Sequence, residues 1–191
     1  MNEQFDSDRF GPVAARLLAP GRVCDLGPGK PNREALPLLK GLRPEGLFAG
    51  QIIADRSAAR ACIAGIWLYH DFLDESHAIS QEIDTPEGSF WHGIMHRREP
   101  DYSNAKYWFR RVGEHPVFEP LRREAADLAQ QSKLDEAAEF LSLRVAWDPY
   151  AFVDLCEAVA SGRSNSGELA RAVQMKEWEL LFDYCWRRAR S

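Results

Sequence analysis

The sequence of 191 residues has no long apolar run. Its longest such run, residues 61–69, falls far short of the roughly 20 residues that a membrane-spanning helix needs. The first residues, Met1 to Asp6, are polar and acidic, unlike a secretory signal peptide. We therefore expect no membrane attachment and a cytoplasmic location.

Cysteine is scarce and scattered, and no two cysteines form a C-x-x-C pair. The four residues are Cys24, Cys62, Cys156 and Cys185. Isolated cysteines of this kind behave as small, partly buried apolar residues in a reducing compartment. We expect free thiols, and a chain of this length can bury a sizeable core without disulfides.

An excess of positive charge is also missing, since the formal net charge is −5. Nucleic acids and anionic membranes bind clustered positive charge, so neither is an expected partner.

Two catalytic or binding motifs are absent as well. Without G-x-S-x-G and without G-x-G-x-x-G after a strand, the sequence disfavours a serine nucleophile of that type and a nucleotide-binding Rossmann unit.

What is present favours a helical fold. The composition is that of an ordinary globular protein, with 45% apolar and 28% charged residues, and the length fits one domain over residues 1–191. Proline and glycine are frequent in residues 1–50, which predicts a loop-rich arm, whereas residues 51–191 predict a helical core. We expect an all-α fold, an irregular helical bundle around a long antiparallel helix hairpin, wrapped by that arm.

The hairpin is predicted from two segments. Residues 51–80 contain no proline and carry apolar residues at helical spacing, which predicts one long helix. Thr85 followed by Pro86 is typical of a helix start, and this second helix should end near Arg98. Because the connection is short, the two helices should pack antiparallel.

All five histidines lie within residues 67–116. If the hairpin folds back at the middle of its connection, residues whose numbers sum to about 166 face each other. His70 then faces His96, and Asp74 faces His92, so two pairs with i, i+4 spacing meet at one level. Imidazole and carboxylate groups that converge from two helices suit one divalent ion, namely zinc, iron, manganese or nickel. The predicted ligands are His70, Asp74, His92 and His96.

Other side chains of the same segment could take part in chemistry or binding. Glu99 could act as a base, His77 continues the face of the first helix, and a buried Lys106 could hold a carboxylate or a carbonyl. Aromatic, amide and guanidinium groups could wall or hold a small-molecule ligand, and these are Trp67, Trp91, Trp108, Asn104, Tyr107 and Arg97. Each has a structural alternative: core packing for the tryptophans, a surface position for the lysine, and ion pairing for the arginine.

The metal interpretation leaves alternatives open. H-x-x-x-H is a weak signal alone, because a zinc-protease helix needs Glu directly after its first His, and Gly93 stands there. Buried histidines are often only hydrogen-bonded, so the segment could also form a metal-free polar pocket or a structural network. We expect a small-molecule enzyme or ligand-binding protein with a His/carboxylate pocket, performing metal-assisted hydrolysis or a lyase step. The alternative is a non-catalytic helical interaction module with a structural histidine network.

One run within this segment, Trp91 to Trp108, has the pattern W-H-x-x-x-H-R-R-E-x-D-x-x-N-x-K-Y-W. It resembles a family of small helical proteins without an established activity that share this pattern. The resemblance covers this part of the chain alone. It implies that the segment is a functional signature, and it implies no particular reaction or metal.

Overall fold

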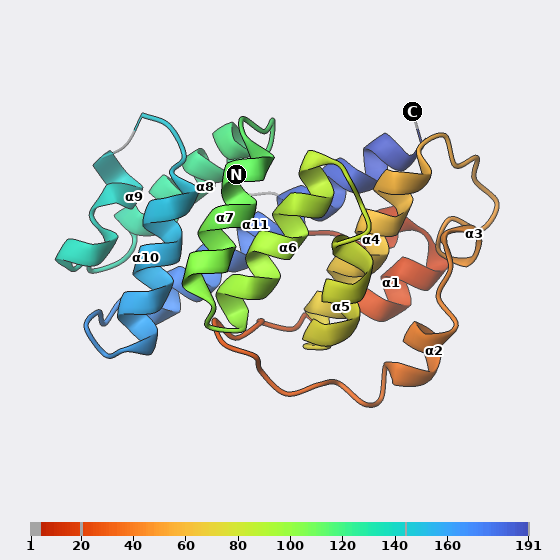
Figure 1. Cartoon of the computed structure of the whole chain (residues 1–191), viewed down its shortest axis with the longest axis horizontal. Helices are drawn as coiled ribbons and strands as arrows, with labels where there is room; N and C mark the ends of the chain where they lie inside the picture. The colour runs from red at the N-terminus through yellow and green to blue at the C-terminus, as the bar shows by residue number, and fades with distance from the viewer. Residues whose placement is uncertain (1–4, 20, 144, 191) are drawn as a thin grey trace.

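The computed structural model describes residues 5–19, 21–143 and 145–190. These residues form helices, turns and loops with no β-strand among them, so the all-α prediction is confirmed (Figure 1). None of the helices in these ranges combines the length and the apolar character of a membrane span. The elements in chain order are η1 (Ser7–Phe10), α1 (Pro12–Leu18), α2 (Leu36–Lys40), α3 (Pro44–Leu47), α4 (Arg56–Tyr69), α5 (Leu73–Ser80), α6 (Pro86–Arg98), α7 (Tyr102–Val112), α8 (Phe118–Gln130), η2 (Glu136–Ala138), α9 (Phe140–Leu143), α10 (Pro149–Ala160) and α11 (Gly167–Arg190).

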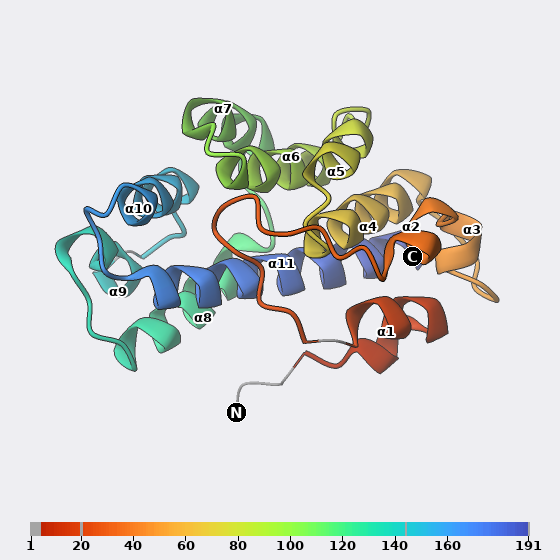
Figure 2. The same ribbon diagram turned by 90° about the horizontal axis from the view of Figure 1, so that it is seen from below.

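The long helix α11 runs along the molecule, with α4 to α7 on one side and α1 and α8 on the other (Figure 2). Its buried face repeats at intervals of one turn, as Trp178, Phe182 and Trp186 show. The Trp178 Nε1–H group also donates a hydrogen bond of 2.8 Å to the Gly65 carbonyl of α4. The aromatic face of α11 therefore holds the layer of helices that contains α4.

The N-terminal arm is anchored on the same aromatic face. The Phe10 ring packs edge-on against Phe182 and Trp186, with centroids 5.0 and 5.4 Å apart. Phe48, just after α3, stacks on Trp186 with a centroid separation of 4.1 Å. Between these anchors, a long loop connects α1 to α2 and passes beside α4 and α5 (Figures 1 and 2).

The predicted single helix over residues 51–80 is wrong, because the chain breaks between α4 and α5 at Asp71. Asp71 has a φ of 62°, a left-handed conformation that residues other than glycine rarely adopt. Its carboxylate forms ion pairs with Arg22 of the arm, at 2.6 Å, and with Arg98 of α6. Gly29 packs against the same carboxylate so closely that a Cβ there would lie 2.6 Å from Asp71 Cγ. These distant partners stabilise a break that helical periodicity cannot reveal.

The second helix of the predicted hairpin is confirmed. Thr85 caps α6, its hydroxyl accepting a hydrogen bond from the Gly88 N–H, and the helix ends at Arg98. The helices α5 and α7 both pack against α6 (Figure 1). At Gly93 an added Cβ would lie 3.1 Å from the Phe109 ring of α7, so this glycine permits the close approach. α6 is buried from Glu87 to Arg98, and its polar side chains face neighbouring elements.

Candidate metal centre

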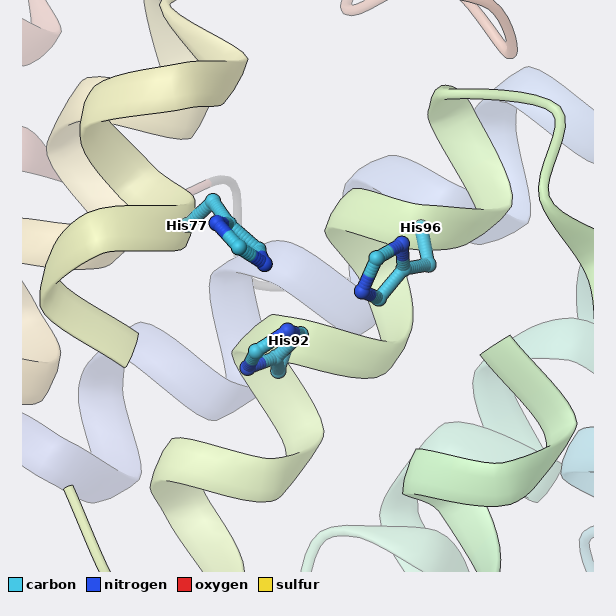
Figure 3. A group of neighbouring side chains, drawn as sticks. All are labelled: His77, His92 and His96. Carbon is cyan, nitrogen blue, oxygen red and sulfur yellow. The ribbon is translucent and has the colours of Figure 1, made fainter. Parts of the chain in front are cut away.

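Three histidine side chains meet between α5 and α6 (Figure 3). His77 comes from α5, and His92 and His96 come from α6. One potential ligand nitrogen from each ring lies within 4.8 Å of the other two. The ring centroids are 4.6 Å apart for His77 and His92, 5.4 Å for His77 and His96, and 4.8 Å for His92 and His96. In the described part of the chain, no other histidines, cysteines or carboxylates gather in this way.

Helix geometry explains this meeting. His92 and His96 are one turn apart and therefore share a face of α6. The short connection before Thr85 turns the chain back, so α5 packs beside α6 and presents His77 to that face. Since the chain breaks at Asp71, α5 rather than α4 brings a histidine to the pair.

Helix α7 and the end of α6 complete the surroundings. Asn104 Nδ2 lies 3.0 Å from His96 Nε2, and the Trp108 ring stacks on His92 with centroids 3.8 Å apart and planes at 14°. Glu99, the C-cap residue of α6, places its Oε2 atom 3.2 Å from His96 Nδ1. The group is thus framed by an amide, an indole and a carboxylate.

Burial holds the two α6 imidazoles in the neutral form. The exposed fractions of His92 and His96 are 2% and 6%. Burial, followed by the proximity of His96 and His77, lowers the pKa of His92 to about 3. Burial likewise lowers the pKa of His96, although the Glu99 carboxylate opposes the shift. Because metal ions bind neutral imidazole, ring lone pairs are available at neutral pH.

One buried nitrogen of the group has no hydrogen-bond partner among the described residues. His92 Nδ1 is buried and forms no hydrogen bond with any described residue. An unsatisfied buried polar atom costs about 1–3 kcal/mol, and such atoms in native proteins call for an explanation such as a bound ion. In a tetrahedral zinc site with bonds near 2.1 Å, ligand nitrogens lie about 3.4 Å apart. The ligand nitrogens, which lie within 4.8 Å of one another, would have to draw closer to bind such an ion.

A cleft of about 460 Å³ adjoins the histidine group through Glu99, and none of the three histidines is among its lining residues. Its lining includes backbone of the arm at Gly29 and Pro31, and the acidic residues Asp74, Glu75 and Glu99. Glu99 belongs to both features, because it lines the cleft and contacts His96. Among the described residues, Asp74 and Glu75 have no ion-pair partner, so the cleft carries uncompensated negative charge beside the candidate ligands.

The predicted facing of His70 and His96 is wrong. His70 is the C-cap of α4, where its Nε2 donates a 2.9 Å hydrogen bond to the Leu17 carbonyl. Its Nδ1 accepts a hydrogen bond of 3.0 Å from Asn32 Nδ2. Both ring nitrogens are therefore used to tie the arm to α4. The structure also places Asp74 outside the group, in the exposed first turn of α5.

These positions change the ligand set predicted from the sequence. His92 and His96 come together as predicted, whereas His77, expected as a catalytic residue, takes the place assigned to His70 and Asp74. A register shift of about three residues in the fold-back would have set His77 opposite His92. The break at Asp71 separates His70 from α5, so His70 does not follow α5 in its fold-back on α6.

Three of the residues predicted to bind a ligand lie in the core instead. The Arg97 side chain is fully buried, pairs with the fully buried Glu177 of α11, and lies over the Phe152 ring at 4.5 Å. Trp91 is fully buried, and Trp67 packs edge-on against its neighbours in the core. These side chains hold α6 and α4 in place. The structural alternatives, core packing for the two tryptophans and ion pairing for the arginine, are therefore what the structure shows.

The residues predicted on α7 separate into two groups. Lys106 forms an ion pair with Asp154 of α10, with exposed side-chain fractions of 34% and 57%, and Tyr107 is 47% exposed. Asn104 and Trp108, one turn apart, face the histidines. Spacing within α7 is the signal that distinguishes the two groups, because residues four apart share a face.

The arrangement has the components of a transition-metal site. Imidazoles converge from two helices, a carboxylate and an amide contact one of them, and a cleft adjoins that carboxylate. Carboxylates that contact ligating histidines orient them and raise their basicity in known metal sites. Comparisons with protein-family models, with curated proteins and with solved structures found no match to this chain.

Proposed function

We propose that this protein is a metal-dependent enzyme acting on a small molecule, with a divalent ion held by His77, His92 and His96. The supporting observation is the convergence of the three imidazoles, in which His92 keeps a buried nitrogen without a partner. Nitrogen-rich donor sets suit zinc, iron, manganese or nickel, and zinc is the first ion to test. Hydrolysis, or a related lyase step, is the reaction that we propose.

A bound ion would supply a water molecule of lowered pKa, near 7 in zinc enzymes. The residues around it have separate roles in this proposal. Glu99 accepts a hydrogen bond from His96 Nδ1 and so orients that ring. Because Glu99 also lines the cleft, it is the candidate base for a proton from water or substrate.

The cleft is the proposed substrate space. Its volume of about 460 Å³ suits a small molecule. The carboxylates of Asp74, Glu75 and Glu99 on its wall favour a neutral or positively charged compound over an anion. In this proposal the arm and α5 recognise the substrate, and the bound ion and the side chains of α6 perform the chemistry.

Metal analysis of tag-free protein tests the centre. Wild-type protein incubated with Zn²⁺, Mn²⁺, Fe²⁺ or Ni²⁺ and then freed of excess ion should retain about one ion per chain. The His77→Ala and His92→Ala variants should lose it. His115→Gln is the matched control, because His115 is also a buried histidine but lies outside the group, and it should retain the ion.

The reaction is tested separately with small esters, lactones, amides and phosphoesters, each with and without the retained ion. Turnover that depends on the ion and on Glu99 would support the enzyme. Metal binding without turnover would restrict the proposal to ligand binding. A folded wild-type protein that retains none of the four ions would overturn the centre and leave the non-catalytic interaction module.

A further inference from the structure

The Trp108 ring makes the closest and most parallel ring contact of the histidine group. It stacks on His92 with centroids 3.8 Å apart and planes at 14°. The His77 ring meets the same imidazole edge-on, at 79°, and the His96 ring is farther from it, at 4.8 Å. Because the ligand lone pairs of an imidazole lie in the ring plane, a stack on its face occupies neither nitrogen.

Helix packing places Trp108 in this position. Gly93 directly follows His92 on α6, and Phe109 directly follows Trp108 on α7. An added Cβ at Gly93 would lie 3.1 Å from the Phe109 ring, so the two helices approach closely at this level. Phe109 is 1% exposed and anchors α7 in the core. The packing of its neighbour therefore holds the indole against His92.

The orientation of the His92 ring depends on this stack. In known metal sites a ligating histidine usually donates its other N–H to a carboxylate or a carbonyl, which fixes the ring. His96 has a carboxylate partner in Glu99, at 3.2 Å. His92 Nδ1 has no hydrogen-bond partner among the described residues. The face of Trp108 is therefore the contact that can orient His92.

The stack also suits an imidazole that carries positive charge. Carbon atoms in contact lie about 3.5–4.0 Å apart, so ring centroids 3.8 Å apart leave little lateral offset. Two neutral aromatic rings prefer an offset or edge-on contact to this arrangement. A bound metal ion withdraws electrons from an imidazole, and the electron-rich face of tryptophan attracts a positively charged partner more strongly than that of phenylalanine.

We infer that Trp108 is the positioning residue for His92, because its indole holds the ring in the orientation that binds the ion and favours the ion-bound imidazole over the empty one. The inference rests on the proposed metal at the histidine group. It requires that metal affinity depend on the electrons of the indole face. A contact that only packs the helices together would not have this dependence.

Titrations of full-length Trp108→Leu and Trp108→Phe with Zn²⁺ and with Co²⁺ test this role. Trp108→Leu loses the aromatic face and should weaken binding at least about tenfold, the scale on which groups around a metal ligand act. Trp108→Phe keeps a ring with a weaker face, so it should bind more tightly than Trp108→Leu. Tyr102→Leu is the matched control, since Tyr102 is a partly buried aromatic residue of the same helix, and it should leave affinity unchanged.

Fluorinated tryptophan separates the electronic role from packing, and it also tests the inference if Trp108→Leu does not fold. Fluorine atoms withdraw electrons from the indole face and change its shape little. In protein made with tryptophans of increasing fluorine content, affinity for both ions should fall step by step. The same replacement in Trp108→Phe should leave affinity unchanged, because the stacked indole is gone.

Wild-type affinity in Trp108→Leu, or affinity that does not respond to fluorine, would show that Trp108 only packs against the histidines. Either result would overturn this inference and leave the proposed centre intact. A folded wild-type protein that binds neither ion would overturn both.

Discussion

Two buried histidines of this protein, His70 and His92, differ in how their nitrogens are satisfied. Their exposed fractions are nearly equal, at 1% and 2%. His70 uses both nitrogens, one on the Leu17 carbonyl and one on Asn32. His92 leaves Nδ1 without a partner and lies beside two further imidazoles. His92 therefore differs from His70 both in its unpaired nitrogen and in its imidazole neighbours. The neighbours are needed for the distinction, because the buried Nε2 of His115 also lacks a hydrogen bond among the described residues although His115 lies outside the group.

The same contrast continues along α6. Within about one turn of His96, Arg97 and Arg98 each meet a buried carboxylate, on Glu177 and Asp71. These ion pairs connect α6 to α11 and to the helix break. On the histidine face, the carboxylate that contacts His96 belongs to the half-exposed Glu99, and no buried ion pair is present among the described residues there. The two faces should therefore respond differently to substitution.

The largest expected effect comes from breaking the paired face. Glu177→Ala leaves the fully buried Arg97 guanidinium without its carboxylate, so it should lower the free energy of unfolding by about 3–5 kcal/mol. Urea denaturation measures this loss. Glu119→Ala, which removes the exposed partner of Arg122, is the control and should leave stability almost unchanged. Equal costs for the two variants would show that the buried ion pair of α6 stabilises the fold no more than an exposed one.

The same substitution at the two histidines sharpens the comparison. His70→Leu leaves the Leu17 carbonyl and the Asn32 amide without partners, so it should cost about 2–4 kcal/mol. His92→Leu removes an unsatisfied nitrogen, so the metal-free protein should change by about 1 kcal/mol or less, in either direction. Urea denaturation in the presence of a chelator compares them. A larger loss at His92 than at His70 would show that His92 is also structural.

The last prediction is a pH dependence of stability that does not involve the metal group. Burial lowers the pKa of His115 from 6.5 to about 4, with Arg188 lowering it further and Glu87 opposing. Above pH 6.5 both folded and unfolded states are neutral at this residue. Between pH 6.5 and about 4 the unfolded state alone binds the proton, so stability should fall as pH falls, by up to about 1.4 kcal/mol per pH unit.

Denaturation of the metal-free wild type and of His115→Gln across pH 7 to 4.5 measures this contribution. The free energy of unfolding of the variant should fall less steeply as pH falls. The difference between the two slopes should correspond to about one bound proton. Equal slopes for the two proteins would mean that His115 has the same pKa in both states.

Local signals predicted part of this structure well. Thr85 and the proline after it located the start of α6, and the i, i+4 spacing placed His92 and His96 on one face. The break at Asp71 could not be predicted in this way. It depends on Arg22 and Arg98, which lie 49 and 27 positions away along the chain.

The errors in the predicted site follow from that break. Because α4 ends at Tyr69, His70 lies outside α5, and His77 of α5 takes its place beside the α6 pair. Arg97 illustrates the same limit, because its partner Glu177 lies 80 positions away. Ion pairs between distant residues override local propensity, and a single sequence does not show them.

Anomalous X-ray diffraction at the metal absorption edge tests the central claim most directly, using crystals grown with Zn²⁺ and, separately, with Mn²⁺. The proposal predicts one strong anomalous peak between α5 and α6, bonded to His77, His92 and His96 at about 2.0–2.2 Å. Peaks only at surface carboxylates, or no peak within bonding distance of these three rings, would contradict it.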